Sequence, residues 1–268
     1  MKYIKITSIS NPMIREAFDI KNRRSKYKHT AFLIEGPNLV EAAMTSGNRI
    51  MEVFLTRAFS EKEMSQRLLK KISENTSKIF EVEEHIINKL AGTETPRGIV
   101  AVASYRLLSL NDLPLKDNPF LVVIDAVQDP GNLGTIIRTA DAAGVDAAIL
   151  LPGTCDAFMP KAIRSTAGSI FNIPILYTET DMLLRWLHGE NIQLIITSAD
   201  AEKSIYDIDL KKPLAMVFGN EAHGASEKIR KSADLLSRIP IYGKAESLNV
   251  ATAAAVCLYE AVRQRRLK

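Results

Sequence analysis

The sequence contains little cysteine and no long apolar segment. Its two cysteines, Cys155 and Cys257, lie far apart and neither belongs to a Cys-x-x-Cys pair, which favours buried free thiols over a disulfide or a zinc site. No run of about 18 apolar residues is present, so a membrane-spanning helix is not expected. Residues 1–8 lack the apolar core and the small-residue cleavage site of a secretion signal. We therefore expect a cytoplasmic protein.

Several common functional motifs are missing as well. No Gly-x-Gly-x-x-Gly follows a predicted strand, and neither Gly-x-x-x-x-Gly-Lys-Ser/Thr nor Gly-x-Ser-x-Gly occurs. The first two motifs bind the phosphates of nucleotides, and the third holds an activated serine. Their absence disfavours nucleotide-dependent oxidoreductases, nucleoside-triphosphate-binding proteins and serine hydrolases. No cluster of cysteine and histidine indicates a metal site.

The composition is that of an ordinary globular protein, with an uneven distribution of charge. Of 268 residues, 46% are hydrophobic and 25% are charged, which suits one large or two medium domains. Residues 1–118 hold 19 Lys and Arg against 14 Asp and Glu, whereas residues 119–268 hold 16 against 17. The basic excess of the first part predicts an anionic partner for that part.

Short apolar segments alternate with helical patterns in the first part. Asn11 and Pro12 are typical of the cap and first turn of a helix. Predicted strands cover residues 31–34, 51–55 and 78–82, and predicted helices cover residues 38–45, 61–74 and 83–90. This alternation predicts a small α/β domain over residues 1–105. Residues 106–118 show no clear period and are predicted to form a linker.

The strongest basic cluster follows the first predicted helix. It comprises Lys21, Arg23, Arg24, Lys26, Lys28 and His29, with Tyr27 between two of the lysines, and Arg23, Arg24, Lys26 and Lys28 are the candidates for RNA binding. A phosphate backbone is a natural partner for such a cluster. The cluster equally suits the solvated end of a helix, where cations complement the helix dipole.

The second part begins with the apolar run Phe120–Ala126, which is typical of a strand buried on both faces in a parallel sheet. Further predicted strands and helices alternate to the end of the chain, and together they predict an α/β domain over residues 119–268. Three loops at the C-terminal ends of predicted strands combine glycine with polar side chains: Asp129–Arg138, Phe218–Gly224 and Ile239–Asn249. Open α/β sheets bind ligands at this edge.

The first loop contains an asparagine and an arginine whose spacing along the chain bears on where their side chains point. Asn132 and Gly134 are predicted to lie in a turn before a helix that begins at Thr135, and Arg138 follows one helical turn after Gly134. We expect Arg138 to point toward the same space as Asn132. Its guanidinium can bind a phosphate or stabilise a developing oxyanion there. The alternative is a surface arginine beside an N-cap asparagine.

The second loop places polar side chains directly after a buried strand. Gly219 permits close approach of the backbone to a ligand, and Glu221 is either a helix cap or a functional hydrogen-bond acceptor. His223 can act as an acid or base, yet a loop histidine without a nucleophile or metal partner is more often incidental.

The third loop leads from a short predicted strand, Ile239–Ile241, into an Ala-rich helix, Val250–Val262. Ser247 and Asn249 are residue types that cap a helix. Free backbone N–H groups above an apolar helix favour a ligand site. The alternative is an ordinary connection between a strand and a helix.

Taken together and in this order, the three loops resemble the signature motifs of the SpoU (TrmH-like) RNA 2′-O-ribose methyltransferases of the SPOUT superfamily. The residues that carry the resemblance are Asn132, Gly134 and Arg138; Gly219, Asn220 and Glu221; and Ile239-Pro-Ile241, Glu246 and Ser247-Leu-Asn-Val250. Family members often have a serine after the last motif, where this chain has Ala251. Phe32–Gly36 and Thr95–Val102 are similar to parts of the family's substrate-binding domain, which is itself similar to ribosomal protein L30e.

The resemblance implies an α/β fold in which a small L30e-like domain precedes a C-terminal SPOUT domain with a parallel sheet and a deep trefoil knot. It also implies S-adenosylmethionine as the cofactor and a homodimer formed through the C-terminal domain. The implied cofactor-binding residues are Gly219, Ile239, Leu248, Thr197, Ser198 and Ala199. The implied catalytic residues are Arg138, Asn132, Glu221, Ser247 and Asn249. Arg138 is either the base or, because a guanidinium stays protonated in proteins, the group that holds a phosphate and stabilises the alkoxide.

We expect the protein to methylate ribose 2′-hydroxyl groups of structured RNA with S-adenosylmethionine as the methyl donor. Among structured RNAs, 23S ribosomal RNA is the expected substrate. The basic cluster of the first part is then expected to bind the RNA backbone. The alternatives are a tRNA 2′-O-methyltransferase and a non-catalytic RNA-binding relative. The non-catalytic relative predicts loss of Arg138, Asn132 or Asn249, and all three are present. No metal and no membrane partner are expected.

Overall fold

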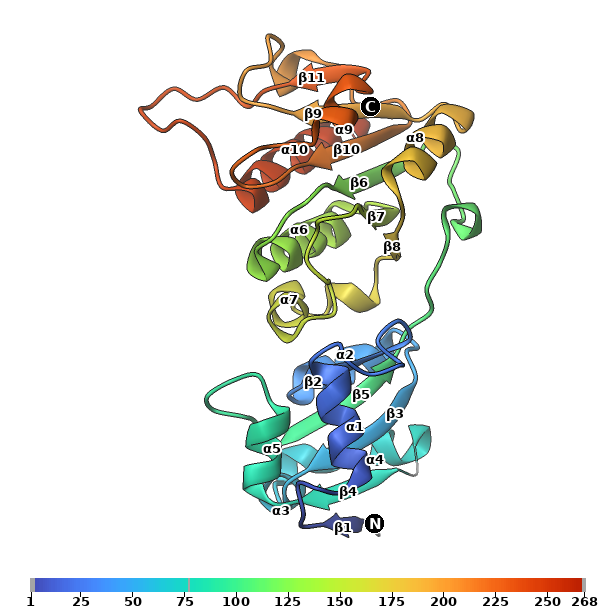
Figure 1. The fold of residues 1–268 in the computed structure, drawn as a ribbon, viewed down its shortest axis with the longest axis vertical. Helices are drawn as coiled ribbons and strands as arrows, with labels where there is room; N and C mark the ends of the chain where they lie inside the picture. The colour runs from blue at the N-terminus through green and yellow to red at the C-terminus, as the bar shows by residue number, and fades with distance from the viewer. Residues whose placement is uncertain (1–2, 77, 267–268) are drawn as a thin grey trace. The chain divides into compact units, whose positions relative to one another are not determined.

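The computed structural model describes residues 3–76 and 78–266 (Figure 1). Contacts divide the chain into two compact units. The first comprises Met1–Leu107 with Phe158–Phe171, and the second comprises Leu108–Ala157 with Asn172–Lys268. The outer limits of the two predicted domains, residues 1 and 268, lie outside the described residues.

The first unit contains a five-stranded mixed sheet with the strand order β1-β4-β3-β5-β2. Its strands are β1 (Ile4–Ile6), β2 (Ala31–Glu35), β3 (Ile50–Leu55), β4 (Ile79–Val82) and β5 (Ile99–Ser104). Its helices include α1 (Pro12–Lys21), α2 (Pro37–Thr45), α3 (Arg57–Ser60), α4 (Glu63–Asn75) and α5 (Glu84–Leu90). Asn11 caps α1 as predicted, because its Oδ1 accepts from Met13 N at 2.9 Å. Strand β1 was not predicted, since only Ile6 of its three residues is buried.

The segment Phe158–Phe171 groups with the first unit, although the sequence analysis assigns it to residues 119–268. It carries α7 (Pro160–Thr166) and the 3-10 turn η2 (Ser169–Phe171). Phe158 and Phe171 pack on Phe32 of β2, with ring centroids 4.8 and 5.9 Å away. Aromatic contacts between such distant residues leave no mark on local sequence patterns.

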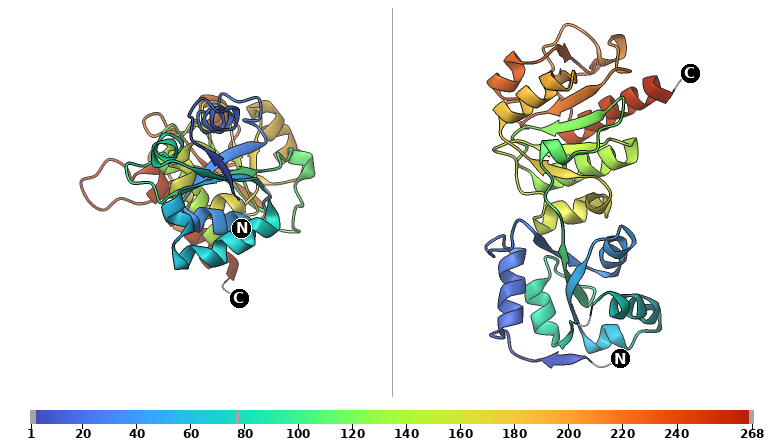
Figure 2. Two further views of the ribbon diagram at one scale, coloured as in Figure 1. Left: turned by 90° about the horizontal axis from the view of Figure 1, so that it is seen from below. Right: turned by 90° about the vertical axis from the view of Figure 1, so that its right-hand side faces the viewer.

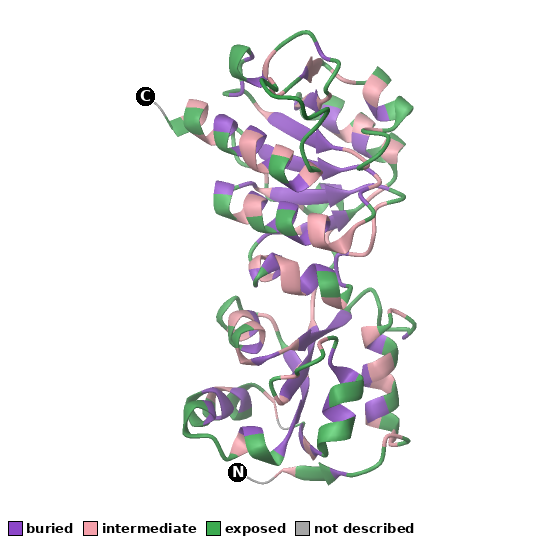
Figure 3. Cartoon of the chain, turned by 90° about the vertical axis from the view of Figure 1, so that its left-hand side faces the viewer, coloured by how far each residue is buried: buried purple, intermediate pink, exposed green. Residues whose placement is uncertain are grey.

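The second unit contains a six-stranded sheet with the order β11-β9-β10-β6-β7-β8, in which every described pair of strands is parallel. Its strands are β6 (Phe120–Ile124), β7 (Ala147–Leu150), β8 (Ile175–Tyr177), β9 (Gln193–Thr197), β10 (Leu214–Phe218) and β11 (Leu235–Ser237). All residues of β6 and β10 are buried (Figure 3). The predicted α/β class and parallel sheet are therefore confirmed.

Helices cover both faces of this sheet. They are α6 (Pro130–Ala143), α8 (Thr180–Gly189), α9 (Glu227–Lys231) and α10 (Val250–Arg266), and the unit also contains the 3-10 turn η3 (Ile205–Asp207). Helices α6 and α10 lie on one face, and α8 and α9 lie on the other (Figure 2, right). This arrangement leaves the C-terminal ends of the strands open to loops.

The edge strand β11 corrects one prediction. The strand expected at Ile239–Ile241 is wrong, because the chain pairs with β9 at Leu235–Ser237 instead. Pro240 lacks an N–H and cannot donate to a ladder. The loop after β11 is consequently longer than predicted, and it begins at Arg238.

Residues 106–118 contain more structure than the predicted linker implies. The 3-10 turn η1 (Leu110–Asp112) begins after Ser109, whose N–H and hydroxyl both donate to Asp112 Oδ2. Leu110 is buried in the core of the second unit, and three further leucines pack against that core: Leu108, Leu113 and Leu115.

In the described part of the chain, no helix is both long enough and apolar enough to cross a membrane.

Candidate active site

The candidate site lies where the strand order of the parallel sheet reverses. From β6 the chain proceeds outward to β7 and β8, and it then returns to build β9, β10 and β11 on the other side of β6. Strands β6 and β10 are neighbours, so the loops that follow them diverge at a topological switch point. Ligands of open α/β sheets bind at such points.

The loop after β6 turns into helix α6 earlier than predicted. Asp129 is the N-cap, with its Oδ1 accepting from Asn132 N at 2.9 Å, and Pro130 takes the first helical position. Asn132 therefore lies in the first turn of α6 rather than in a turn before it. The pair Asp129-Pro130 is itself a helix-start signal that could have located this boundary.

This earlier start changes the expected direction of Arg138. Six helical positions separate Asn132 from Arg138, so their side chains leave the axis about 120° apart. Arg138 is exposed and makes no hydrogen bond or ion pair with any described residue. The two side chains thus leave α6 in different directions, and the role of Arg138 in the site stays a prediction.

Three residues from the three loops form one hydrogen-bonded network. Asn132 Nδ2 donates to Glu221 Oε1 at 2.9 Å, and Asn249 Nδ2 donates to Asn132 Oδ1 at 3.0 Å. Asn249 Oδ1 accepts from Ala251 N at 2.9 Å and Thr252 N at 3.3 Å, so Asn249 also caps α10. Residues 117 positions apart in the sequence thus hold the N-terminal ends of α6 and α10 together.

The loop after β10 folds back tightly on itself. Asn220 and Gly224 exchange two backbone hydrogen bonds of 2.8 and 2.9 Å. A Cβ atom on Gly219 would lie 2.1 Å from Ala225 N, so only glycine fits beneath this turn. Asn220 Nδ2 donates to Ala126 O at 2.9 Å and fastens the turn to the loop after β6. The side chain of Asn220 thus positions the two loops relative to each other, a role that the sequence pattern did not predict.

A cavity of about 370 Å³ opens beside this network. All six residues predicted to bind the cofactor line it: Thr197, Ser198, Ala199, Gly219, Ile239 and Leu248. Of the predicted catalytic residues, Glu221 and Ser247 line it as well, whereas Asn132, Arg138 and Asn249 do not. Its size lies in the range of ordinary small-molecule sites, about 300–1,000 Å³. Apolar side chains beside backbone polar groups and a carboxylate fit S-adenosylmethionine, which joins a flat base to a charged amino acid and a cationic sulfur.

The carboxylate of Glu221 is held in its ionised form. Burial by itself would raise the pKa of Glu221, but hydrogen bonds from Asn132 and from backbone N–H groups, including those of Gln128 and Asp129, outweigh it and lower the pKa. A negative charge therefore lies beside the cavity at neutral pH, where it suits a cationic ligand.

This lowered pKa predicts a stability effect at acid pH. The ionised carboxylate stabilises the fold above the pKa of the unfolded chain, and this stabilisation is lost as pH falls through the lower folded value. We expect Glu221→Gln to make thermal unfolding less sensitive to pH below about 4.5. Melting temperatures of both proteins, measured between neutral and acid pH, check this. A constant difference between the two curves would contradict it.

Asn249 has two tasks that substitutions can separate. Asn249→Asp keeps the oxygen that caps α10 but replaces the donor to Asn132 with a second oxygen. We expect near-normal stability and loss of activity. Asn249→Ala removes the cap too and is expected to cost a further ~1 kcal/mol of unfolding free energy. Denaturant unfolding and activity assays on both variants distinguish the two tasks, and equal stability of the variants would argue against the cap.

Both cysteines are protonated at neutral pH. Burial, together with the charges of Asp129, Glu221 and Asp156, raises the pKa of Cys155 to about 11. Burial, with a smaller effect of Glu260, raises that of Cys257 to about 12. Cys155 is half-buried rather than fully buried as expected. Neither thiol is a nucleophile at neutral pH.

The parallel sheet and the cavity at its switch point define a ligand-binding α/β protein, and comparison with known proteins identifies its family. Residues 119–259 match the model of the SpoU rRNA Methylase family, and residues 11–101 match the MRM3-like substrate binding domain. The chain belongs to the SpoU rRNA methylase family, and the predicted family is confirmed.

Relatives resemble the chain over nearly its whole length. It is 34% identical over 255 residues to the 23S rRNA (guanosine(2553)-2′-O)-methyltransferase RlmP of Bacillus subtilis, with 95% of this chain and 98% of that protein covered. It is 36% identical over 241 residues to the 23S rRNA (guanosine-2′-O-)-methyltransferase RlmB of Haemophilus influenzae, with 87% and 97% covered. The AdoMet-bound rRNA methyltransferase of Sinorhizobium meliloti superposes with a TM-score of 0.87 at 32% identity, covering 98% of each chain.

Proposed function

We propose that the protein transfers the methyl group of S-adenosylmethionine to a ribose 2′-OH of ribosomal RNA. The observation that carries this function is the network of Asn132, Glu221 and Asn249 beside a cavity lined by all the predicted cofactor residues. The predicted enzyme class and cofactor are confirmed by membership of the family and by the AdoMet-bound relative. The intact network favours this function over a non-catalytic relative.

The residues of the cavity and of the hydrogen-bonded network beside it have distinct proposed roles. Bound S-adenosylmethionine supplies an electrophilic methyl group on a cationic sulfur. Gly219 would let the backbone approach the cofactor closely, and the apolar side chains of Ile239 and Leu248 would help to hold it. Glu221 places a negative charge beside the cavity, which would suit the cationic cofactor, and it fixes Asn132. Asn249, itself fixed by Asn132 and by the end of α10, orients the ribose together with the hydroxyl of Ser247.

Arg138 is proposed to act on the RNA. Methylation of the 2′-oxygen would require its hydroxyl proton to pass to water or to a phosphate oxygen. A guanidinium remains protonated in proteins, so Arg138 stabilises the developing alkoxide and the adjoining phosphate instead of accepting the proton. Its exposure and lack of internal partners leave it available to the substrate.

The basic cluster contains one residue that differs from the others. The guanidinium of Arg23 donates to Ala31 O at 2.9 Å and to Lys28 O, and lies 5.5 Å from the ring centroid of Phe158. Arg23 therefore fixes the loop, whereas Arg24, Lys26 and Lys28 are exposed. We propose that these three bind RNA phosphates.

This division of roles predicts different defects. We expect Arg24→Ala with Lys28→Ala to weaken RNA binding and to reduce the slope of log affinity against log salt by about 2. Arg23→Ala is expected to lower the melting temperature. Filter binding over a range of salt concentrations checks the first effect, with Lys70→Ala, an exposed cation of α4, as control. An unchanged slope in the double variant would remove the cluster from the RNA interface.

We further propose a homodimer, a trefoil knot and a cytoplasmic location. The support for the homodimer is helix α10, which presents Tyr259, 51% exposed, beside half-buried Val256 and Val262; this apolar surface suits a second copy.

The support for the knot is the backbone of Arg238, which is hydrogen-bonded to residues 203 and 205 at 2.8 Å and places the start of the final loop beside an earlier loop. Sedimentation is expected to give a dimer, and mechanical extension is expected to leave a residual knot. A cytoplasmic location fits a ribosomal RNA substrate.

The proposed function is tested by calorimetric titration with S-adenosylmethionine. We expect saturable binding to the purified protein, and competition by the demethylated product at the same site. Glu221→Gln is expected to weaken binding because it removes the negative charge beside the cavity. No binding at millimolar cofactor would contradict the proposed function.

A further inference from the structure

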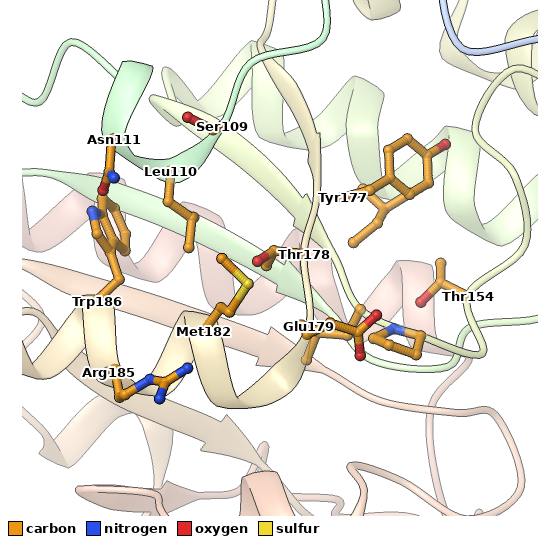
Figure 4. Close-up of a pocket in the computed structure, with 13 residues that line it drawn as sticks. Ser109, Leu110, Asn111, Thr154, Tyr177, Thr178, Glu179, Met182, Arg185 and Trp186 are labelled. Carbon is orange, nitrogen blue, oxygen red and sulfur yellow. The ribbon is translucent and has the colours of Figure 1, made fainter.

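A second cavity lies on the same edge of the parallel sheet, beyond the ends of β7 and β8 (Figure 4). Its volume is about 750 Å³, roughly twice that of the candidate cofactor cavity. Its walls come from η1, the loops after β7 and β8, and the first turns of α8. All of these elements belong to the second unit.

The inner surface of this cavity suits a flat ring. Trp186 is half-buried with its indole beside Asn111, and the buried side chain of Leu110 lies next to it (Figure 4). Met182, 54% exposed, reaches toward Leu110 from the preceding turn of α8. An indole face beside aliphatic side chains favours stacking of another planar group.

Polar side chains around this apolar surface have unused hydrogen-bonding capacity. Asn111, Glu179 and Arg185 line the cavity, and none of their side chains makes a hydrogen bond to another described residue. The amide offers a donor and an acceptor, the carboxylate accepts, and the guanidinium donates. A planar heterocycle with a hydrogen-bonding edge, such as a nucleobase, matches both the apolar and the polar features.

The loop after β7 connects this cavity with the candidate active site. Thr154 lines the cavity, and its hydroxyl donates to Ile124 O and accepts from Ala126 N, both at 3.0 Å. Cys155 N donates to Val127 O at 2.9 Å. The loop is thus hydrogen-bonded to the segment that follows β6. Further along that segment, the backbone N–H groups of Gln128 and Asp129 donate to the carboxylate of Glu221. This loop therefore joins a wall of the second cavity to the backbone that holds Glu221 beside the candidate cofactor cavity.

We propose that the second cavity binds an unpaired base of the RNA near the methylated nucleotide, stacked on Trp186. The proposal rests on the proposed function, because its ligand is the same RNA strand that is proposed to bind at the active site. Glu179 accepts hydrogen bonds from exocyclic amino groups, so bases that carry one bind better than uracil.

Trp186 allows a direct test because it is the only tryptophan of the chain. Short single-stranded RNA oligonucleotides of each base are titrated while the tryptophan fluorescence is recorded. We expect saturable quenching, weakest for oligouridylate. Asn111→Ala and Met182→Ala keep the reporter and are expected to weaken the quenching affinity several-fold. Met64→Ala, at an exposed methionine of α4, is the matched control and should leave the affinity unchanged.

Kinetics with ribosomal RNA separate this proposal from the proposed function. Trp186→Ala is expected to raise KM for RNA about tenfold or more with little change in kcat, and Trp186→Phe to restore it largely. If the protein methylates RNA without quenching and Trp186→Ala leaves KM unchanged, the cavity does not bind RNA, and a protein segment becomes its expected occupant. If quenching occurs without cofactor binding or methyl transfer, the proposed function fails while the base-binding cavity stands.

Discussion

Gly219→Ala is expected to abolish cofactor binding while most of the fold persists. The added methyl carbon would lie 2.1 Å from Ala225 N and 2.2 Å from the carbonyl carbon of Gly224, and both are backbone atoms that no rotamer change can move. The turn that Asn220 and Gly224 close must therefore open or shift. Because this turn lines the cavity and carries Glu221, its displacement disturbs both the cofactor and the network.

The expected size of this effect is a loss of affinity for S-adenosylmethionine of at least about 100-fold, or about 3 kcal/mol of binding free energy. Calorimetric titration measures the affinity, and circular dichroism checks that the fold persists. Gly189→Ala is the matched control, because a Cβ at the end of α8 meets nothing within 4 Å. Normal affinity in Gly219→Ala would show that the turn can move freely or that the cofactor binds elsewhere.

Arg138→Ala is expected to lower kcat for methyl transfer by about 100- to 1,000-fold, the usual cost of removing a group that stabilises a developing oxyanion. Cofactor affinity is expected to stay normal, because Arg138 does not line the cavity. Binding of RNA is expected to persist largely, since many phosphate contacts share it. Single-turnover transfer of labelled methyl to ribosomal RNA measures the effect.

Two further variants sharpen this test. Arg138→Lys keeps the positive charge but loses the planar fork, and it is expected to restore only a small part of the activity. Thr135→Ala changes another exposed residue of α6 and is expected to leave turnover normal. Full activity in Arg138→Ala would remove Arg138 from the catalytic step.

The sequence predicts the fold best where a segment is apolar enough to be buried on all sides. The run Phe120–Ala126 was predicted as a strand, and β6 covers Phe120–Ile124, since a strand buried on both faces contains few polar residues. The edge strand β11 was misplaced by four residues, because Leu235–Ser237 is only partly buried and gives a weak pattern. The grouping of Phe158–Phe171 with the first unit depends on aromatic contacts between distant residues.

For the candidate site, the sequence predicts which residues meet better than how they are oriented. Glycine and asparagine at strand ends, together with the family resemblance, indicated Gly219, Asn132 and Asn249, and the structure brings their loops together. The orientation of Arg138 depended on where α6 begins, and the N-cap Asp129 moved that start by five residues. The second cavity gave no sequence signal, because Leu110 and Trp186 belong to segments that meet only in the folded chain.

The most direct measurement of the central claim is the site of methylation in RNA. Ribosomal RNA lacking this modification is incubated with the purified protein and S-adenosylmethionine carrying an isotopically labelled methyl group. Nucleosides from the digested RNA are then analysed by mass spectrometry. We expect the label on a single 2′-O-methylated nucleoside, with none for Arg138→Ala. Label on a base instead of a ribose, or no label in ribosomal RNA despite normal cofactor binding, would contradict the account.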